Sequence, residues 1–327
     1  MLNAVQLAPP EVTFTVSPAE AVEISRIADR LQSVSDEVDD DAWVAAARSS
    51  WEFLPGGYRR RVREFRRDSG PAGVMVVRGL PVDDSRLPNT PSVAGSVQRT
   101  TTGPAALLMM TACGLGDPAA FLAEKSGALV QDVVPVPGRE DFQGNAGSVD
   151  LMMHNENAFH PHRPDYVMLL CLRPDHDRVA GLRTASIREA LPLLSDRTRQ
   201  ALARPEFNTQ PPPSFGSAGA GAPELPVLTG ESADPDVRVD FAATTGLTPS
   251  ARAALTELSL ALDEVARTVR LLPGDLAIVD NHVTLHGRTA FQPRYDGRDR
   301  WLQRTFVLAD LRRSRDHRPG DGYVLER

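Results

Sequence analysis

The chain has 327 residues, of which 41% are hydrophobic and 24% are charged, and its formal net charge is −7. Such a length and composition are typical of a globular protein with a large buried core. The acidic balance argues against a nucleic acid or an anionic membrane as partner, so we expect a small molecule instead.

The N-terminal stretch predicts a cytoplasmic protein that begins with helices. Residues 1–16 have neither the basic start nor the unbroken apolar core of a signal peptide, and no later apolar run is long enough to span a bilayer. From Pro18 to about Phe65, apolar residues recur at three- and four-residue steps after a Ser-Pro start. This pattern predicts a helical preamble within residues 1–70.

Strand and helix patterns follow one another through the rest of the chain. Strands are predicted by the β-branched and apolar runs at 73–82, 127–138, 165–175, 274–288 and 301–311. Helices are predicted by the periodic spacing of apolar residues at 104–116, 186–204 and 250–271. The outline is mainly β with flanking α, and it contains no internal repeat and no glycine-rich phosphate loop after a strand.

Residues 208–226 (NTQPPPSFGSAGAGAPELP) consist almost entirely of turn and linker residues. They fit either a solvated interdomain linker or a mobile flap over a site, because long irregular loops inside compact domains are often functional. We treat residues 1–327 as a single domain in which 208–226 is a lid loop of the active site.

The stretch LMMHNENAFHPH (151–162) carries the chemistry. In an extended segment, side chains two positions apart project to the same side, so His154 and Glu156 face one ion. His286, on a later strand-like run, is the candidate for a third ligand. Two imidazoles and one carboxylate leave coordination positions open, as in non-haem Fe(II) oxygenases. An isolated H-x-E match, however, is more often a chance pairing than a metal site.

Two arginines strengthen the oxygenase interpretation. Arg300 and Arg304 are separated by an even number of residues along a predicted strand, so both guanidinium groups lie on one face. A planar guanidinium is well shaped to bind a carboxylate with two hydrogen bonds. The pair therefore suggests a dicarboxylate co-substrate and a second substrate that carries a carboxylate.

The blocks HNENAFHPHRPDYVMLLCLRPD and VDNHVTLHGRTAFQPRYDGRDRWLQRTFVL resemble the clavaminate synthase-like branch of the Fe(II)/2-oxoglutarate oxygenases, especially its amino acid β-hydroxylases acting on arginine or asparagine. The resemblance implies a double-stranded β-helix, or jelly roll, that uses Fe(II), 2-oxoglutarate and O2. It implies His154, Glu156 and His286 as iron ligands. Arg300 matches the arginine that binds the distal carboxylate of 2-oxoglutarate, and Arg304 the one that binds the α-carboxylate of the substrate.

The same resemblance points to further residues around the substrate. Thr184 matches a threonine that assists the 2-oxoglutarate carboxylate, and Glu156 is long enough to bind iron and still lie near a substrate ammonium group. Arginine hydroxylases of this branch carry a pair of acids where this chain has Asp240 and, two positions later, alanine. Where the family often has a substrate-binding glutamine, the candidates are Glu124 and Lys125.

We therefore expect hydroxylation of an unactivated C–H bond, at Cβ, of a free L-amino acid. The expected substrates include basic amino acids such as arginine or lysine, but the departures at Ala242 and at Glu124 and Lys125 count against arginine and leave a different side chain open. The high proline and alanine content is compatible with an antibiotic pathway. One alternative keeps the same iron centre but uses an aminoacyl group on a carrier protein, or performs desaturation or cyclisation. Another is a non-catalytic jelly-roll binding module.

The remaining residues with metal-binding side chains have no expected role as ligands. His160 and His162 are expected to shape the loop around Pro161, and His176, His282 and His317 to be structural or at the surface. Cys113 and Cys171 are expected to be buried free thiols.

Overall fold

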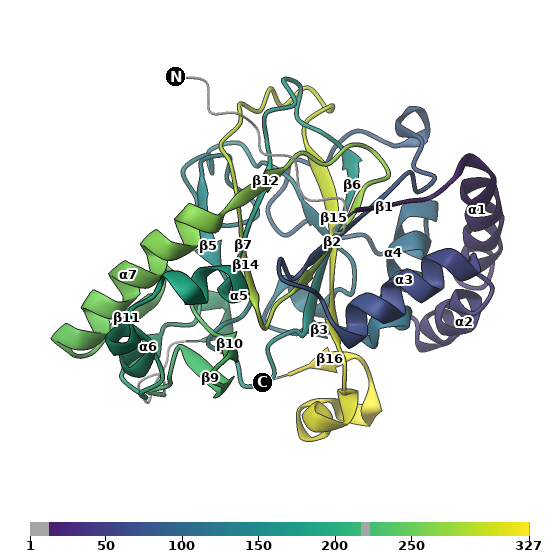
Figure 1. The fold of residues 1–327 in the computed structure, drawn as a ribbon. Coiled ribbons are helices and arrows are strands. Elements are labelled where there is room, and N and C mark those ends of the chain that lie inside the picture. Colours follow the sequence, from purple (N-terminus) through teal and green to yellow (C-terminus); the bar gives the residue numbers. More distant parts are fainter. Residues whose placement is uncertain (1–12, 217–222, 327) are drawn as a thin grey trace.

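Two β-sheets face each other at the centre of the molecule, and helices cover the outer side of each (Figure 1). The computed structural model describes residues 13–216 and 223–326. Neighbours in the larger sheet are antiparallel except for the pairs β1–β2 and β3–β16. Its spatial order is β1 (Thr13–Thr15), β2 (Val74–Arg78), β13 (Leu276–Asp280), β6 (Tyr166–Arg173), β15 (Trp301–Leu308), β3 (Asp117–Phe121) and β16 (Val324–Leu325), with β4 (Gln131–Val133) also paired to β15.

The smaller sheet is antiparallel throughout. Its order is β12 (Arg267–Val269), β7 (Leu182–Ser186), β14 (Thr284–Arg288) and β5 (Leu151–His154). Two further antiparallel pairs lie outside both sheets: β8 (Phe207–Thr209) with β11 (Thr244–Gly246), and β9 (Leu228–Glu231) with β10 (Asp234–Val237).

The central strands are apolar on both faces because each face is buried against a different layer. Along β6, Val167, Leu169 and Cys171 belong to the cluster between the two sheets. The alternate residues Met168 and Leu170 belong to the cluster under the outer helices. This two-sided burial explains why the sequence of β6 reads as a continuous apolar run instead of an alternating one.

The helices α1 (Pro18–Gln32), α2 (Asp41–Trp51), α3 (Gly56–Arg67) and α4 (Gly103–Leu115) cover the larger sheet. The start of α1 is fixed by a capping box, in which Ser17 and Glu20 each accept a hydrogen bond from the other's backbone N–H. Nearly every residue of α4 is buried, because this helix lies between the other three and the sheet. The preamble expected within residues 1–70 therefore packs as part of the core.

Three more helices cover the smaller sheet: α5 (Ile187–Ala190), α6 (Asp196–Leu202) and α7 (Pro249–Val265). The prediction of one helix over 186–204 was wrong: Pro192 sits in the 3-10 turn η4 (Leu191–Leu193), and the Ser195 side chain then caps α6 as a separate helix. The helix predicted over 250–271 ends at Val265, and the chain continues into β12.

Turns and short 3-10 helices make up much of the remainder: η2 (Asp84–Arg86), η3 (Lys125–Gly127), η5 (Pro213–Phe215), η6 (Leu311–His317) and η7 (Pro319–Asp321). The strand predicted over 127–138 is confirmed only at β4, since Pro135 and Pro137 cannot donate to a sheet. Of the predicted lid loop 208–226, residues 217–222 lie outside the described residues, so the lid stays a prediction.

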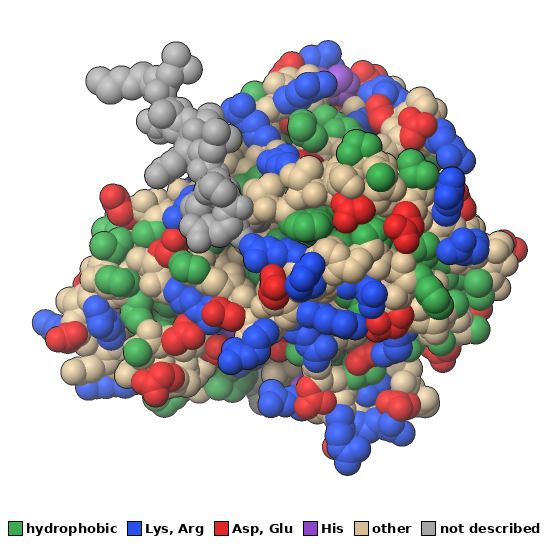
Figure 2. Space-filling model, turned by 45° about the vertical axis from the view of Figure 1, so that its right-hand side comes forward, with side chains coloured by type: hydrophobic (Ala, Val, Ile, Leu, Met, Phe, Trp, Pro, Cys, Tyr) green, Lys and Arg blue, Asp and Glu red, His purple; other side chains and the backbone are tan. Residues whose placement is uncertain are grey.

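On the face of the molecule shown in Figure 2, basic and acidic side chains are interspersed with apolar ones. Within residues 13–216 and 223–326, no helix is long and apolar enough to cross a membrane. Cys113 and Cys171 are both free thiols.

Candidate active site

Three of the predicted site residues lie in one row across the smaller sheet. Thr184 on β7 pairs with His286 on β14, and His286 pairs with His154 at the end of β5. Residues directly opposite on antiparallel strands project to the same side, and Leu182, two positions before Thr184, belongs to the cluster between the sheets. The row therefore faces the interior. The ring centres of the two histidines are 4.5 Å apart.

Glu156 joins this pair from just beyond the end of β5. One potential ligand atom from each of His154, Glu156 and His286 lies within 4.8 Å of the others. His154 Nδ1 donates to the Met152 carbonyl at 2.9 Å, which leaves Nε2 available to a metal. His286 Nε2 lies 3.6 Å from Glu156 Oε2.

The charges at this cluster favour metal binding. Burial alone would raise the pKa of Glu156, but the Arg304 guanidinium, and after it the contacts with the two histidines, hold that pKa well below its usual range. Burial and the neighbouring His154 lower the pKa of His286. An ionised carboxylate beside a neutral imidazole is the protonation state that a metal ion requires of its ligands.

Arg304 on β15 reaches this cluster from the opposite sheet. Its guanidinium donates to Glu156 at 2.9 Å and is also bonded to Glu124 and Gln131. Arg304 Nε and Glu124 Oε2 are buried without a hydrogen-bond partner. Burial raises the pKa of Glu124 despite the adjacent guanidinium. In a native fold, buried unsatisfied polar atoms often mark the place of a ligand.

Arg300 is buried immediately before β15, and its guanidinium lies 5.7 Å from the centre of the Phe291 ring. No carboxylate within the described residues lies at ion-pair distance from it. Arg288 stacks on the same ring at 5.6 Å, but its guanidinium donates to the carbonyls of Gly144 and Val149. Within the described residues, Arg300 is thus a buried arginine without an ion pair.

Of the two other predicted substrate residues, Asp240 borders the cluster and Lys125 does not. Asp240 forms an isolated β-bridge with His154, and its carboxylate accepts a hydrogen bond from the Ala242 N–H at 2.8 Å. Lys125 points elsewhere, because its ammonium group donates to the backbone carbonyls of Ser96 and Asp132. The sequence reasoning missed Gln131, a neutral side chain whose role depends on the pairing of β4 with β15.

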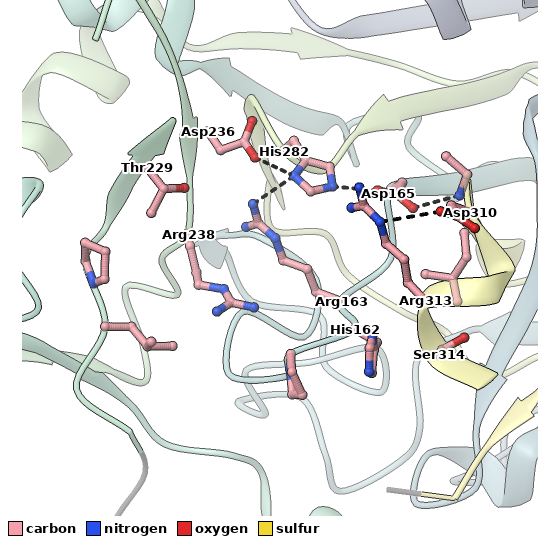
Figure 3. Close-up of a pocket in the computed structure, with 15 residues that line it drawn as sticks. His162, Arg163, Asp165, Thr229, Asp236, Arg238, His282, Asp310, Arg313 and Ser314 are labelled. Atoms are coloured by element: carbon pink, nitrogen blue, oxygen red, sulfur yellow. Dashed lines mark hydrogen bonds and ion pairs between the residues drawn. The ribbon is translucent and has the colours of Figure 1, made fainter. Parts of the chain in front are cut away.

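His282 lies apart from the cluster, in the turn between β13 and β14. Its ring contacts Asp165 at 2.7 Å and Asp236 at 3.0 Å, with Arg163 3.2 Å from Nδ1. Figure 3 shows this group at the wall of a cavity of about 380 Å³, whose other lining residues include Arg238. His282 therefore serves as an ion-paired structural residue, as expected.

Of the other histidines expected to be structural or at the surface, His160 is buried beside the ring of Phe121, with ring centres 4.8 Å apart. His162 and His317 pack against each other with ring centres 4.7 Å apart. His176 contacts Asp296 at 3.0 Å and lies near Asp299, and these three side chains form a second group in which a metal ion could be held.

Comparison with known proteins identifies the family of the chain. The family model described as taurine catabolism dioxygenase, TauD/TfdA family, matches residues 61–306. The chain is 63% identical over 316 residues to L-asparagine oxygenase of Streptomyces coelicolor, covering 96% of this chain and 94% of that protein. It is 36% identical to clavaminate synthase 2 of Streptomyces clavuligerus, covering 83% of each. A crystal structure of asparagine oxygenase with Fe(II), (2S,3S)-3-hydroxyasparagine and succinate superimposes with a TM-score of 0.94 at 60% identity, covering 97% of this chain and 99% of that one.

The fold and the site define a dioxygenase that uses Fe(II), 2-oxoglutarate and O2 to hydroxylate a free amino acid. The chain belongs to the TauD/TfdA family, within its amino acid hydroxylase branch. The expected jelly-roll core and the expected co-substrate are both confirmed.

Proposed function

We propose that the substrate is free L-asparagine and that the enzyme hydroxylates it at C3. The observation that carries this proposal is the 60% identity, over nearly the whole chain, to an oxygenase whose structure holds 3-hydroxyasparagine and succinate. The balanced reaction consumes asparagine, 2-oxoglutarate and O2, and it yields 3-hydroxyasparagine, succinate and CO2. One oxygen atom of O2 enters each of the two organic products.

For the metal, we propose His154, Glu156 and His286 as ligands. This set fits Fe(II): it offers two nitrogens and one carboxylate, and it leaves further coordination positions for 2-oxoglutarate and O2. Bound iron supplies the oxidising chemistry, while the protein positions the substrate and excludes competing reactions.

For 2-oxoglutarate, we propose that Arg300 binds the distal carboxylate, with Thr184 assisting. In support, the Arg300 guanidinium is buried yet pairs with no described carboxylate, and a bidentate contact with a ligand carboxylate would satisfy it. Thr184 is buried in the row that contains both proposed histidine ligands, so its side chain projects to the same side of the sheet as theirs.

For the amino acid, we propose that Arg304 binds the α-carboxylate and that Glu124 and Glu156 accept hydrogen bonds from the ammonium group. The unsatisfied Glu124 Oε2 and Arg304 Nε support this arrangement, since a zwitterion brings a donor to one and an acceptor to the other. Asp240 would then accept from the side-chain amide. A single acid here, with Ala242 two positions later, favours a neutral amide over a guanidinium that requires two.

The deciding experiment measures succinate and amino acid products by mass spectrometry with asparagine, glutamine, aspartate, arginine and lysine. We expect one hydroxyasparagine per succinate with asparagine and much slower turnover of the others. Preferred turnover of arginine or lysine would overturn the assignment of asparagine. A product with two hydrogens fewer would indicate desaturation or cyclisation, and activity only on an aminoacyl carrier protein would indicate the carrier-dependent alternative.

A further inference from the structure

The main chain of Glu156 is held by a side chain and not by a sheet. Strand β5 ends at His154, two residues earlier, so Glu156 has no neighbouring strand. Its backbone N–H donates to Asn281 Oδ1 at 2.8 Å, and its carbonyl accepts from Asn281 Nδ2 at 3.0 Å. One amide thus satisfies both backbone groups of the proposed carboxylate ligand.

Asn281 is itself firmly placed. It is fully buried in the turn between β13 and β14, where its backbone N–H donates to the Asp165 carbonyl at 2.9 Å and its Nδ2 also donates to the Pro164 carbonyl at 2.8 Å. His286 follows five positions later on β14, so the strand that carries the second proposed histidine ligand begins directly after this turn.

Asn155 makes the reciprocal contact from the motif to the turn. Its Nδ2 donates to the Asn281 carbonyl at 2.9 Å and to the Thr284 carbonyl at 3.2 Å, and its Oδ1 accepts from the Val239 N–H at 3.0 Å. Asn155 projects away from the cluster, which is why its neighbours His154 and Glu156 can share the opposite side.

The turn is also anchored on its outer side. The residue after Asn281 is His282, whose ring lies between Asp165 and Asp236 at the cavity wall (Figure 3). Beyond Glu156, Asn157 adopts a positive φ of 50°, so the chain turns away at once. Protein contacts therefore fix the backbone of Glu156 independently of any metal or substrate that its side chain binds.

We propose that Asn281 is a positioning residue that, together with Asn155, locks the backbone of Glu156 to the turn before β14 and so fixes its carboxylate relative to His286. The proposal rests on the ligand set given above. Without Asn281, the buried N–H and C=O of Glu156 lose their hydrogen-bond partners. The backbone that carries the Glu156 carboxylate is then no longer held in position. Residues that orient metal ligands in this way typically contribute about 10- to 100-fold to metal affinity or activity.

The test is an anaerobic calorimetric titration of Fe(II) into the 2-oxoglutarate-loaded protein, at a temperature where circular dichroism shows the native fold. For Asn281→Ala we expect an Fe(II) Kd raised about 10- to 100-fold in this titration. In a separate turnover assay with O2, we expect the variant to release succinate in excess over hydroxylated amino acid. The control is Tyr58→Phe, which removes the buried 2.7 Å bond to Thr111 far from the site. It should lower the melting temperature and leave the Kd unchanged.

Wild-type Kd and wild-type coupling in folded Asn281→Ala would overturn the positioning role. If that variant does not fold, Asn281→Asp decides, because it keeps the acceptor for the Glu156 N–H but places an oxygen against two carbonyls. Its added negative charge attracts Fe(II), so weaker binding supports lost positioning, and unchanged binding with full coupling refutes it. His154→Ala in the same titration separates the two proposals: if it binds Fe(II) normally, the ligand set itself is wrong.

Discussion

His282 makes a stability contribution that should depend on pH in a defined direction. Burial lowers the pKa of His282, but the hydrogen bonds to Asp165 and Asp236 outweigh burial and raise it from its ordinary 6.5 to about 9. A shift of this size corresponds to ~3 kcal/mol for a fully buried group. Because 32% of the side chain is exposed, we reduce the expected contribution to about 1–2 kcal/mol.

The sign follows from the direction of the shift. The folded state binds the proton more tightly than the unfolded state, so the stabilisation is fully present below about pH 6.5 and is lost as the pH rises through about 9. Urea unfolding of the wild type and of His282→Gln at about pH 6, 7.5 and 9.5 measures the contribution of His282 to the free energy of unfolding. Lys125, whose pKa burial lowers to about 8, acts in the opposite direction, but it is present in both proteins and cancels in the difference.

We expect the difference in free energy of unfolding between the two proteins to be about 1–2 kcal/mol near pH 6 and to fall towards zero above pH 9. A difference that stays constant across this range would refute the charged state of His282. It would indicate that the residue acts only through packing.

The remaining predictions concern the site. His154→Ala and His286→Ala should each abolish Fe(II) binding in calorimetry while circular dichroism stays native. Glu156→Asp should keep some Fe(II) binding but impair turnover, because a fixed backbone cannot compensate for the shorter side chain. Arg300→Lys should raise the apparent KM for 2-oxoglutarate about ten- to a hundredfold with every amino acid, through loss of a bidentate contact worth ~1.5–3 kcal/mol. Arg304→Lys should weaken amino acid binding and uncouple succinate release, and normal asparagine affinity in that variant would contradict its role.

Local pattern predicted the strands well where both faces of a strand are buried. The apolar run that became β6 indicates burial on both faces whatever its partner strands are. The pattern does not state which strands become neighbours. The row of Thr184, His286 and His154 depends on that pairing. The spacing therefore suggested His154 with Glu156 and offered His286 only as the candidate third ligand, and the family resemblance then implied all three as iron ligands.

The failures have local causes as well. The helical period over 186–204 continues past Pro192, and the loss of one backbone donor there was enough to break the helix in two. The helix predicted over 250–271 ends early because the β-branched residues Thr268 and Val269 favour a strand. In the structure they lie in β12, which pairs with β7.

Asn155 and Asn281 could not be recognised by chemistry, because a neutral amide carries no charge and suggests no reaction. Their positions nevertheless follow from the demands of the site. Glu156, unlike His154 and His286, lies beyond the end of its strand, so its own N–H and C=O lack a strand partner in a dry interior, at ~1–3 kcal/mol for each unpaired group. Aspartate accepts but cannot donate, and lysine donates but cannot accept. A short amide does both and brings no additional charge beside the metal, which is why asparagine is the side chain suited to this turn.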